Sequence, residues 1–130
     1  MFTSRSLLAT AALAIAAVCH AGETTPRIDQ ASLLKRIDKN DASTVILDVR
    51  TPEEFAKGHV PGAINIPHTH LPARISEVAD AADKDIVLYC ATGIRSEQAA
   101  SRLRENGFTR LLHLDGDMEA WEKQKRPLVK

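Results

Sequence analysis

The chain has 130 residues, with 17 basic and 17 acidic side chains and no formal net charge. This balance argues against a nucleic-acid or acidic-polymer partner, which a strongly charged surface would favour. The length suits one domain with its own hydrophobic core, and a charged fraction of 26% is ordinary for a globular protein.

The first 21 residues have the pattern of a secretory signal peptide. A single charged residue, Arg5, precedes an apolar run from Leu7 to Val18, and Ala21 supplies the small residue before the cut. We therefore expect cleavage after Ala21, export to the periplasm and no part for residues 1–21 in the fold. A membrane anchor is the alternative, although the run is shorter than the roughly 20 residues of a spanning helix.

Signal cleavage would leave one cysteine in the mature chain, because the two cysteines are Cys19 and Cys90. Lipidation of Cys19 is a further alternative to cleavage after Ala21, although Val18 fits such a signal poorly. An unpaired thiol in an oxidising compartment is unusual and marks Cys90 as a candidate reactive group. A buried inert cysteine fits less well, because Cys90 stands between an apolar run and a glycine-containing loop.

After a polar linker at 22–27, short apolar runs alternate with helical patterns over the expected domain at 28–130. We expect strands at Ile28, 44–49, 63–66, 86–89 and 110–114. We expect helices at 31–38, between Thr51 and Gly58, at 71–79, at 96–105, and through Trp121 to Lys125. The apolar runs do not alternate with polar residues, which is typical of strands buried on both faces. Together they predict an α/β fold with a mainly parallel central sheet and helices on both faces, and they leave the strand order open.

Candidate functional residues follow from the ends of the expected strands, where parallel sheets of this kind carry their sites. Cys90 directly follows one strand, and Asp48 to Arg50 ends another. The segment from Cys90 to Ser96 leads through a short loop into a helix. Loop N–H groups and the helix N-terminus favour an anion, so the Cys90 thiol is expected to ionise readily. Arg95 closes the loop and is expected to hold a negatively charged substrate.

Four segments resemble motifs of the rhodanese domain family, in the family's order. They are Leu47–Phe55, Gly58–Pro67, Cys90–Ser96 and Gly116–Trp121. The resemblance implies a single rhodanese-like domain and, with the signal peptide, a small periplasmic thiosulfate sulfurtransferase. It implies transfer of sulfane sulfur from thiosulfate or a similar donor to cyanide or a thiol through a persulfide on Cys90. It implies neither a metal nor an organic cofactor.

The resemblance also implies roles for individual residues. Cys90 is the nucleophile and persulfide carrier, and Asp48 and Arg50 support the loop from behind. A structural ion pair, for instance of Arg50 with Glu53 or Glu54, is the alternative, and the two roles are compatible. The expected substrate-binding residues are Ala91, Thr92, Gly93, Ile94, Arg95 and Ser96.

Position 91 departs from the family pattern. Many active rhodaneses carry an arginine or lysine directly after the cysteine, where this chain has Ala91. The departure implies weak thiosulfate binding or a different natural donor. The expected partners are a small sulfur donor and a thiol or cyanide acceptor, with a protein acceptor as an option. No nucleic acid is expected, and no membrane after signal cleavage.

Two other functions stay open at this point. A sulfur-carrier or protein-binding rhodanese module would pass its persulfide to one dedicated partner without broad turnover. A cysteine-dependent phosphatase or arsenate reductase of similar fold also places a thiolate in an anion loop that ends in arginine. Those loops are longer, whereas four residues separate Cys90 from Arg95 here. The smaller cradle fits one sulfur atom better than a tetrahedral oxyanion.

Overall fold

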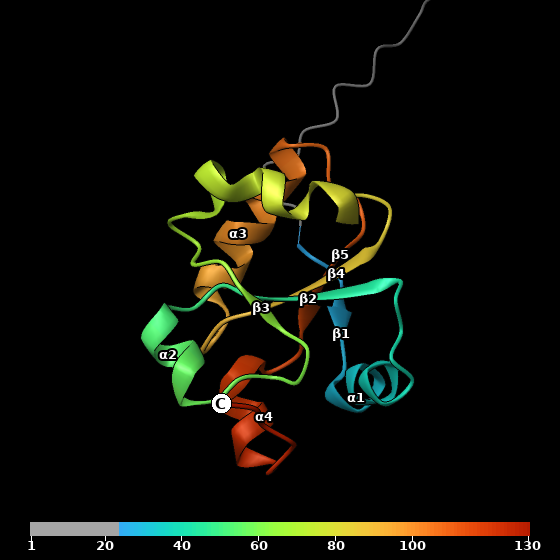
Figure 1. The fold of residues 1–130 in the computed structure, drawn as a ribbon, viewed down its shortest axis with the longest axis vertical. Helices are drawn as coiled ribbons and strands as arrows, with labels where there is room; N and C mark the ends of the chain where they lie inside the picture. The colour runs from blue at the N-terminus through green and yellow to red at the C-terminus, as the bar shows by residue number, and fades with distance from the viewer. Residues whose placement is uncertain (1–23) are drawn as a thin grey trace, which may run out of the picture.

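The computed structural model describes residues 24–130, so the predicted signal peptide lies outside the described residues. Five strands form one sheet in the order β1-β5-β4-β2-β3 (Figure 1). All four pairings between neighbouring strands are parallel, which confirms the predicted parallel sheet. The strands are Arg27–Ile28 (β1), Thr44–Asp48 (β2), Ile64–Asn65 (β3), Asp85–Tyr89 (β4) and Leu111–Leu114 (β5).

Five helical segments connect and cover these strands. Local capping explains where the first two α-helices begin. Asp29 accepts a hydrogen bond from the Ser32 N–H at 2.8 Å, and Thr51 and Glu54 form a reciprocal capping box. The segments are Gln30–Asp38 (α1), Pro52–Lys57 (α2), Leu71–Ala81 (η1), Ile94–Glu105 (α3) and Asp117–Lys123 (α4). No helix within residues 24–130 is long and apolar enough to cross a membrane.

Three helical segments differ from the sequence prediction by more than one residue, and one of them, α4, ends at Lys123 instead of Lys125. The amphipathic helix expected at 71–79 is the 3-10 helix η1, which starts with a proline in its first turn and is kinked at Arg74 (φ −115°, ψ 15°). The helix expected from Ser96 starts two residues earlier, at Ile94. Gly93 allows this early start, because its φ of +122° turns the chain directly from the loop into the helix. The N-terminus of α3 therefore lies closer to Cys90 in the sequence than expected.

The sheet is covered on both faces, as its non-alternating strands predict. Figure 1 shows η1 and α3 above the sheet and α1 and α4 below it. In β4, Ile86 and Leu88 belong to the core under η1 and α3, whereas Val87 and Tyr89 belong to the core with α1 and α4. Successive strand residues point to opposite faces, so a strand buried on both sides reads as one continuous apolar run.

Candidate active site

Cys90 immediately follows β4 at the carboxyl edge of the sheet. Its side chain continues the alternation of Ile86 and Leu88 and belongs to the same core. The residue is 1% exposed. Because hydrogen bonds act more strongly where water is excluded, the groups that contact the sulfur have a large influence on its charge.

The loop after Cys90 turns back on the sulfur. The Gly93 N–H donates to Cys90 Sγ at 3.0 Å, and the Ser96 hydroxyl lies 3.5 Å from the same atom. The N–H donor and the start of α3 both favour negative charge on the sulfur. A Cβ at position 93 would lie 3.1 Å from Asp117 Oδ2, a tight contact, so both the available space and the φ of this position favour glycine.

The remaining loop residues are fixed through their backbone and present their side chains outward. The Cys90 and Ala91 carbonyls accept hydrogen bonds of 3.0 and 3.1 Å from the first N–H groups of α4, those of Met118 and Glu119. Thr92 is exposed, and Ile94 is 73% exposed. The loop is therefore anchored from below by α4, while its outer surface is available to a substrate or partner.

Arg95 closes the loop onto α2 instead of standing free. Its Nη1 and Nη2 donate to the two carboxylate oxygens of Glu54 at 2.7 and 3.0 Å. The hydrogen bonds from Arg95 lower the pKa of Glu54 to about 2. Glu54 in turn raises the pKa of Arg95, and Cys90 acts in the same direction. An anionic substrate would therefore compete with Glu54 for this guanidinium.

Asp48 and Arg50 form a buried ion pair whose side chains are 0% and 6% exposed. Arg50 Nη2 donates to Asp48 at 2.7 Å and to the Gly58 carbonyl at 2.8 Å. The guanidinium also lies 5.6 Å from the centre of the Tyr89 ring. The pair thus supports Tyr89, the residue before Cys90, and the end of α2; its contact with the loop is indirect.

Arg50 does form a structural ion pair, but its partner is Asp48 and not Glu53 or Glu54. Arg50 is bound to Asp48, its neighbour at the end of β2, and Glu54 is bound to Arg95. The fold brings α3 to the start of α2, and this places Glu54 against Arg95 while Arg50 binds Asp48.

A buried polar cluster beneath the loop was not expected from the sequence. His113 Nε2 lies 2.9 Å from both carboxylate oxygens of Asp117, and its Nδ1 lies 2.9 Å from Glu97. Asp117 also accepts the Cys90 N–H at 3.0 Å and the Ser96 hydroxyl at 3.2 Å. The hydrogen bond to Asp117 is the main cause of a raised pKa at His113, and Glu97 adds to it.

Two signs of this cluster are present in the sequence. His113 interrupts the apolar run of β5, and Asp117 follows a turn at the same edge of the sheet as Cys90. The structure adds a backbone sign, because Asp117 has a φ of +53°, a conformation that few residues other than glycine adopt. Such conformations persist where surrounding contacts hold them, and they gather at functional sites.

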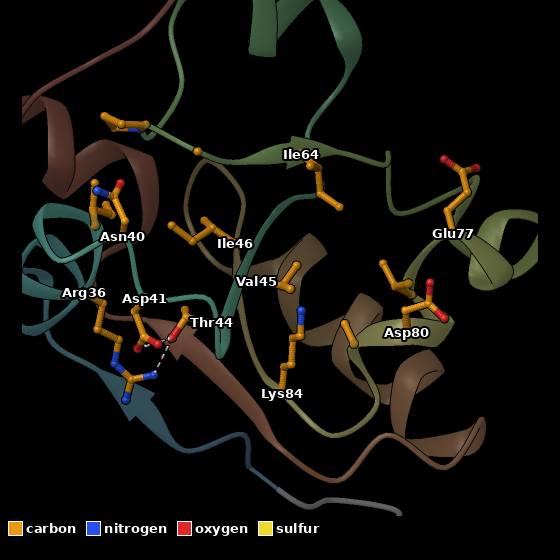
Figure 2. A pocket seen from close by; sticks show the side chains of 15 residues that line it. Arg36, Asn40, Asp41, Thr44, Val45, Ile46, Ile64, Glu77, Asp80 and Lys84 are labelled. Atoms are coloured by element: carbon orange, nitrogen blue, oxygen red, sulfur yellow. Dashed lines mark hydrogen bonds between the residues drawn. The ribbon is translucent and has the colours of Figure 1, made fainter.

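A pocket of about 510 Å³ lies away from this site, beside β2 and β3 (Figure 2). None of the residues that line it belongs to the 90–96 segment. It contains charges of both signs, including Arg36, Asp41 and Lys84, and Arg36 donates to Thr44 at 3.1 Å. Some of its lining residues are thus hydrogen-bonded to one another. Among the described residues that line the pocket there is no nucleophile comparable to Cys90.

The sequence matches the family described as Rhodanese-like domain over residues 29–124. The chain belongs to the rhodanese-like family. This rhodanese-like protein is 38% identical over 102 residues to a sulfurtransferase of Allochromatium vinosum, covering 78% of this chain and 92% of the relative. It is 34% identical over 101 residues to a tRNA uridine(34) hydroxylase of Salmonella paratyphi B, covering 72% of this chain but 29% of that protein.

Solved structures show the same fold. The rhodanese-like domain of an Anabaena protein superposes with a TM-score of 0.71 at 30% identity, covering 82% of this chain and 80% of that one. A Rhodopseudomonas palustris protein described as a possible tyrosine phosphatase superposes with a TM-score of 0.70 at 27% identity, covering 81% and 85%. The fold is thus shared by proteins described in different functional terms, and the reaction must be argued from the site.

Proposed function

We propose that this protein is a sulfurtransferase that carries sulfane sulfur as a persulfide on Cys90. The observation that carries the proposal is the buried Cys90 sulfur, which accepts the Gly93 N–H at 3.0 Å next to the start of α3. Such preorganised donors stabilise a sulfur anion in both the thiolate and the persulfide state. The relative named a sulfurtransferase supports the same reaction class.

The transfer consists of two displacements at sulfur. The Cys90 thiolate attacks the outer sulfur of thiosulfate, the bond to the sulfonate sulfur breaks, and sulfite leaves with the electron pair. Cys90 then carries a persulfide with an anionic terminal sulfur. Cyanide or an acceptor thiolate attacks that sulfur and leaves as thiocyanate or as a new persulfide, while the bonding pair returns to Cys90 as thiolate.

Service as a carrier for one protein partner is the second candidate function. Ala91 adds no charge to the loop, and Arg95 is engaged by Glu54, so these two positions offer a dianionic donor little attraction. The exposed Thr92 and Ile94 give the loop an outer surface that a protein donor or acceptor can contact. Rapid loading with slow turnover on small acceptors would favour this candidate.

The test is to incubate the purified protein with thiosulfate, desalt it and measure its intact mass. We expect a gain of one sulfur atom that cyanide or a reducing thiol removes, and steady production of thiocyanate when both substrates are present. Cys90→Ser is the matched control, since serine is nearly isosteric but does not form a persulfide. Sulfur transfer by Cys90→Ser above background would overturn the proposal. Hydrolysis of an aryl phosphate that depends on Cys90 would favour the phosphatase alternative instead.

We further propose that the reaction takes place in the periplasm after removal of residues 1–21. The support is Arg5, the apolar run that follows it, and Ala21 at the expected cut. Intact mass of the exported protein tests this, with Gly22 expected as the first residue. A protein that retains Met1 contradicts the proposal, and a lipid-bearing Cys19 would identify the lipoprotein alternative.

A further inference from the structure

The Ser96 hydroxyl lies at the centre of the polar cluster beneath the loop. Its Oγ is 2.9 Å from the Gly93 carbonyl, 2.9 Å from His113 Nε2, 3.2 Å from Asp117 Oδ1 and 3.5 Å from Cys90 Sγ. A hydroxyl has one proton to donate and two lone pairs that accept. Whether the Ser96 hydroxyl donates a hydrogen bond to Cys90 Sγ therefore depends on which neighbour donates a hydrogen bond to Ser96 Oγ.

His113 is buried between two carboxylates. Its Nδ1 faces Glu97 of α3 and its Nε2 faces Asp117 of α4, and the His113 side chain is 3% exposed. A carboxylate can only accept, so both ring nitrogens donate only when the ring is an imidazolium. The hydrogen bonds to Asp117 and Glu97 raise the pKa of His113, which favours this charged form.

The other charged and titratable groups around the ring fit the same assignment. Cys90, at the end of β4, reaches His113 through Ser96. On the far side, Thr25 donates to Glu97 at 3.1 Å and accepts from Arg104 at 2.9 Å. Glu97 therefore accepts hydrogen bonds from both Thr25 and the His113 ring.

We propose that His113, held between Asp117 and Glu97, is a positioning residue that does not accept the Ser96 hydroxyl proton and so leaves that proton available to the Cys90 sulfur. An imidazolium Nε2–H is shared between Asp117 and Ser96 Oγ, so the hydroxyl proton points away from the ring, toward Cys90 Sγ, the Gly93 carbonyl and Asp117 Oδ1. A ring with a bare Nε2 would instead accept that proton, and the sulfur would lose a donor. The inference rests on the proposed function, because the sulfur anion that gains the hydrogen bond is the thiolate or persulfide of Cys90.

Charge supports the same arrangement. Asp117 accepts the Cys90 N–H, so its carboxylate lies close to the reactive sulfur, and its side chain is 2% exposed. An uncompensated buried carboxylate would oppose a second negative charge on the sulfur. The imidazolium of His113 offsets it while leaving Asp117 able to hold the Cys90 backbone.

The experiment measures the rate of Cys90 alkylation by iodoacetamide against pH, in the full folded chain. Ser96→Ala and His113→Phe should each raise the pH midpoint of alkylation by about one to two units, the equivalent of one lost hydrogen bond to a charged group. The double variant Ser96→Ala/His113→Phe should shift the midpoint by less than the sum of the two single shifts. His70→Phe, which changes an exposed histidine outside the cluster, should leave the midpoint unchanged.

Two results would overturn the inference. The first is an unchanged alkylation midpoint in folded His113→Phe. The second is a midpoint shift by His113→Phe that is equally large in the wild-type chain and in the Ser96→Ala chain. If His113→Phe does not fold, Glu97→Gln decides the question, because Glu97 is 37% exposed and glutamine still accepts from Nδ1. Glu97→Gln should give a smaller upward shift, and no shift would contradict the inference. Alkylation needs no sulfur donor, so this result is independent of the thiosulfate mass test.

Discussion

Arg95 and Glu54 are 41 positions apart in the sequence and are joined by two hydrogen bonds of 2.7 and 3.0 Å. The same carboxylate closes the capping box of α2 with Thr51. One side chain therefore completes a helix cap and binds the loop arginine. The positive charge of Arg95 is thus already balanced by Glu54. An incoming anionic substrate binds this guanidinium only in competition with that carboxylate.

Replacement of Glu54 by glutamine should improve thiosulfate use. The variant removes the carboxylate that competes for Arg95, while the glutamine amide can still complete the capping box. We expect a lower KM and a rise in kcat/KM of up to about tenfold, equal to about 1.4 kcal/mol. Steady-state kinetics with thiosulfate and cyanide measure this, with Glu53→Gln on the same helical turn as the control. An unchanged KM would show that the donor does not use Arg95.

Ala91→Arg should also raise kcat/KM for thiosulfate. Ala91 is held through its carbonyl by the Glu119 N–H, so a longer side chain can be added without removing a backbone contact. The new cation would lie beside the loop and meet the second charge of the donor. A gain of roughly tenfold corresponds to about 1.4 kcal/mol. Ala91→Gln separates charge from size, and an equal or greater gain in that variant would contradict the electrostatic explanation.

Much of the fold could be predicted from the sequence because its signals are local. The buried runs that became β2 and β4, the Asp29 and Thr51 caps and the stop at Gly58 act over a few residues. The kink in η1 was missed, because amphipathic spacing suits an α-helix as well as a distorted 3-10 helix. The strand order depends on packing between distant segments, so the spacing of apolar residues along the sequence does not reveal it.

The candidate site divides in the same way. The placement of Cys90 before a glycine loop and a helix is readable from neighbouring residues. The partners of Arg95 and of the Cys90 N–H are not, because Glu54 and Asp117 come from other helices. Long-range pairs of this kind arise only when the sheet brings the strand ends together.

Gly93→Ala should destabilise the protein by about 1–3 kcal/mol and slow alkylation of Cys90. The position has a φ of +122°, and the added Cβ would approach Asp117 Oδ2 and His113 Cε1 at 3.1 and 3.3 Å. Urea unfolding and iodoacetamide alkylation measure the two effects. Gly107→Ala is the control, since Gly107 has a φ of +86° and a Cβ added there would meet no atom within 4 Å. That variant should lose stability but keep normal alkylation; matching losses of reactivity in both would contradict a specific role for Gly93.

Stability should fall with rising pH as His113 loses its proton. The hydrogen bond to Asp117 raises the pKa of His113 above its ordinary 6.5. Protonated His113 stabilises the folded protein fully at pH values below its pKa in the unfolded chain. This stabilisation is lost as the pH rises through the higher pKa of His113 in the folded protein. Urea unfolding between about pH 5 and pH 9 should show this decline, with a weaker decline in Glu97→Gln. A stability that rises across this range would show that His113 is neutral in the folded protein.

The hydrogen bond from the Cys90 amide to the Asp117 carboxylate makes that amide a spectroscopic reporter of the site. A backbone proton bound to a buried carboxylate should exchange slowly with solvent and resonate downfield of ordinary amides. Its position should move when His113 titrates, because the same carboxylate serves both groups. One backbone resonance would thus follow the protonation of the cluster and the sulfur load of Cys90 in the same sample, without a chemical label on the thiol.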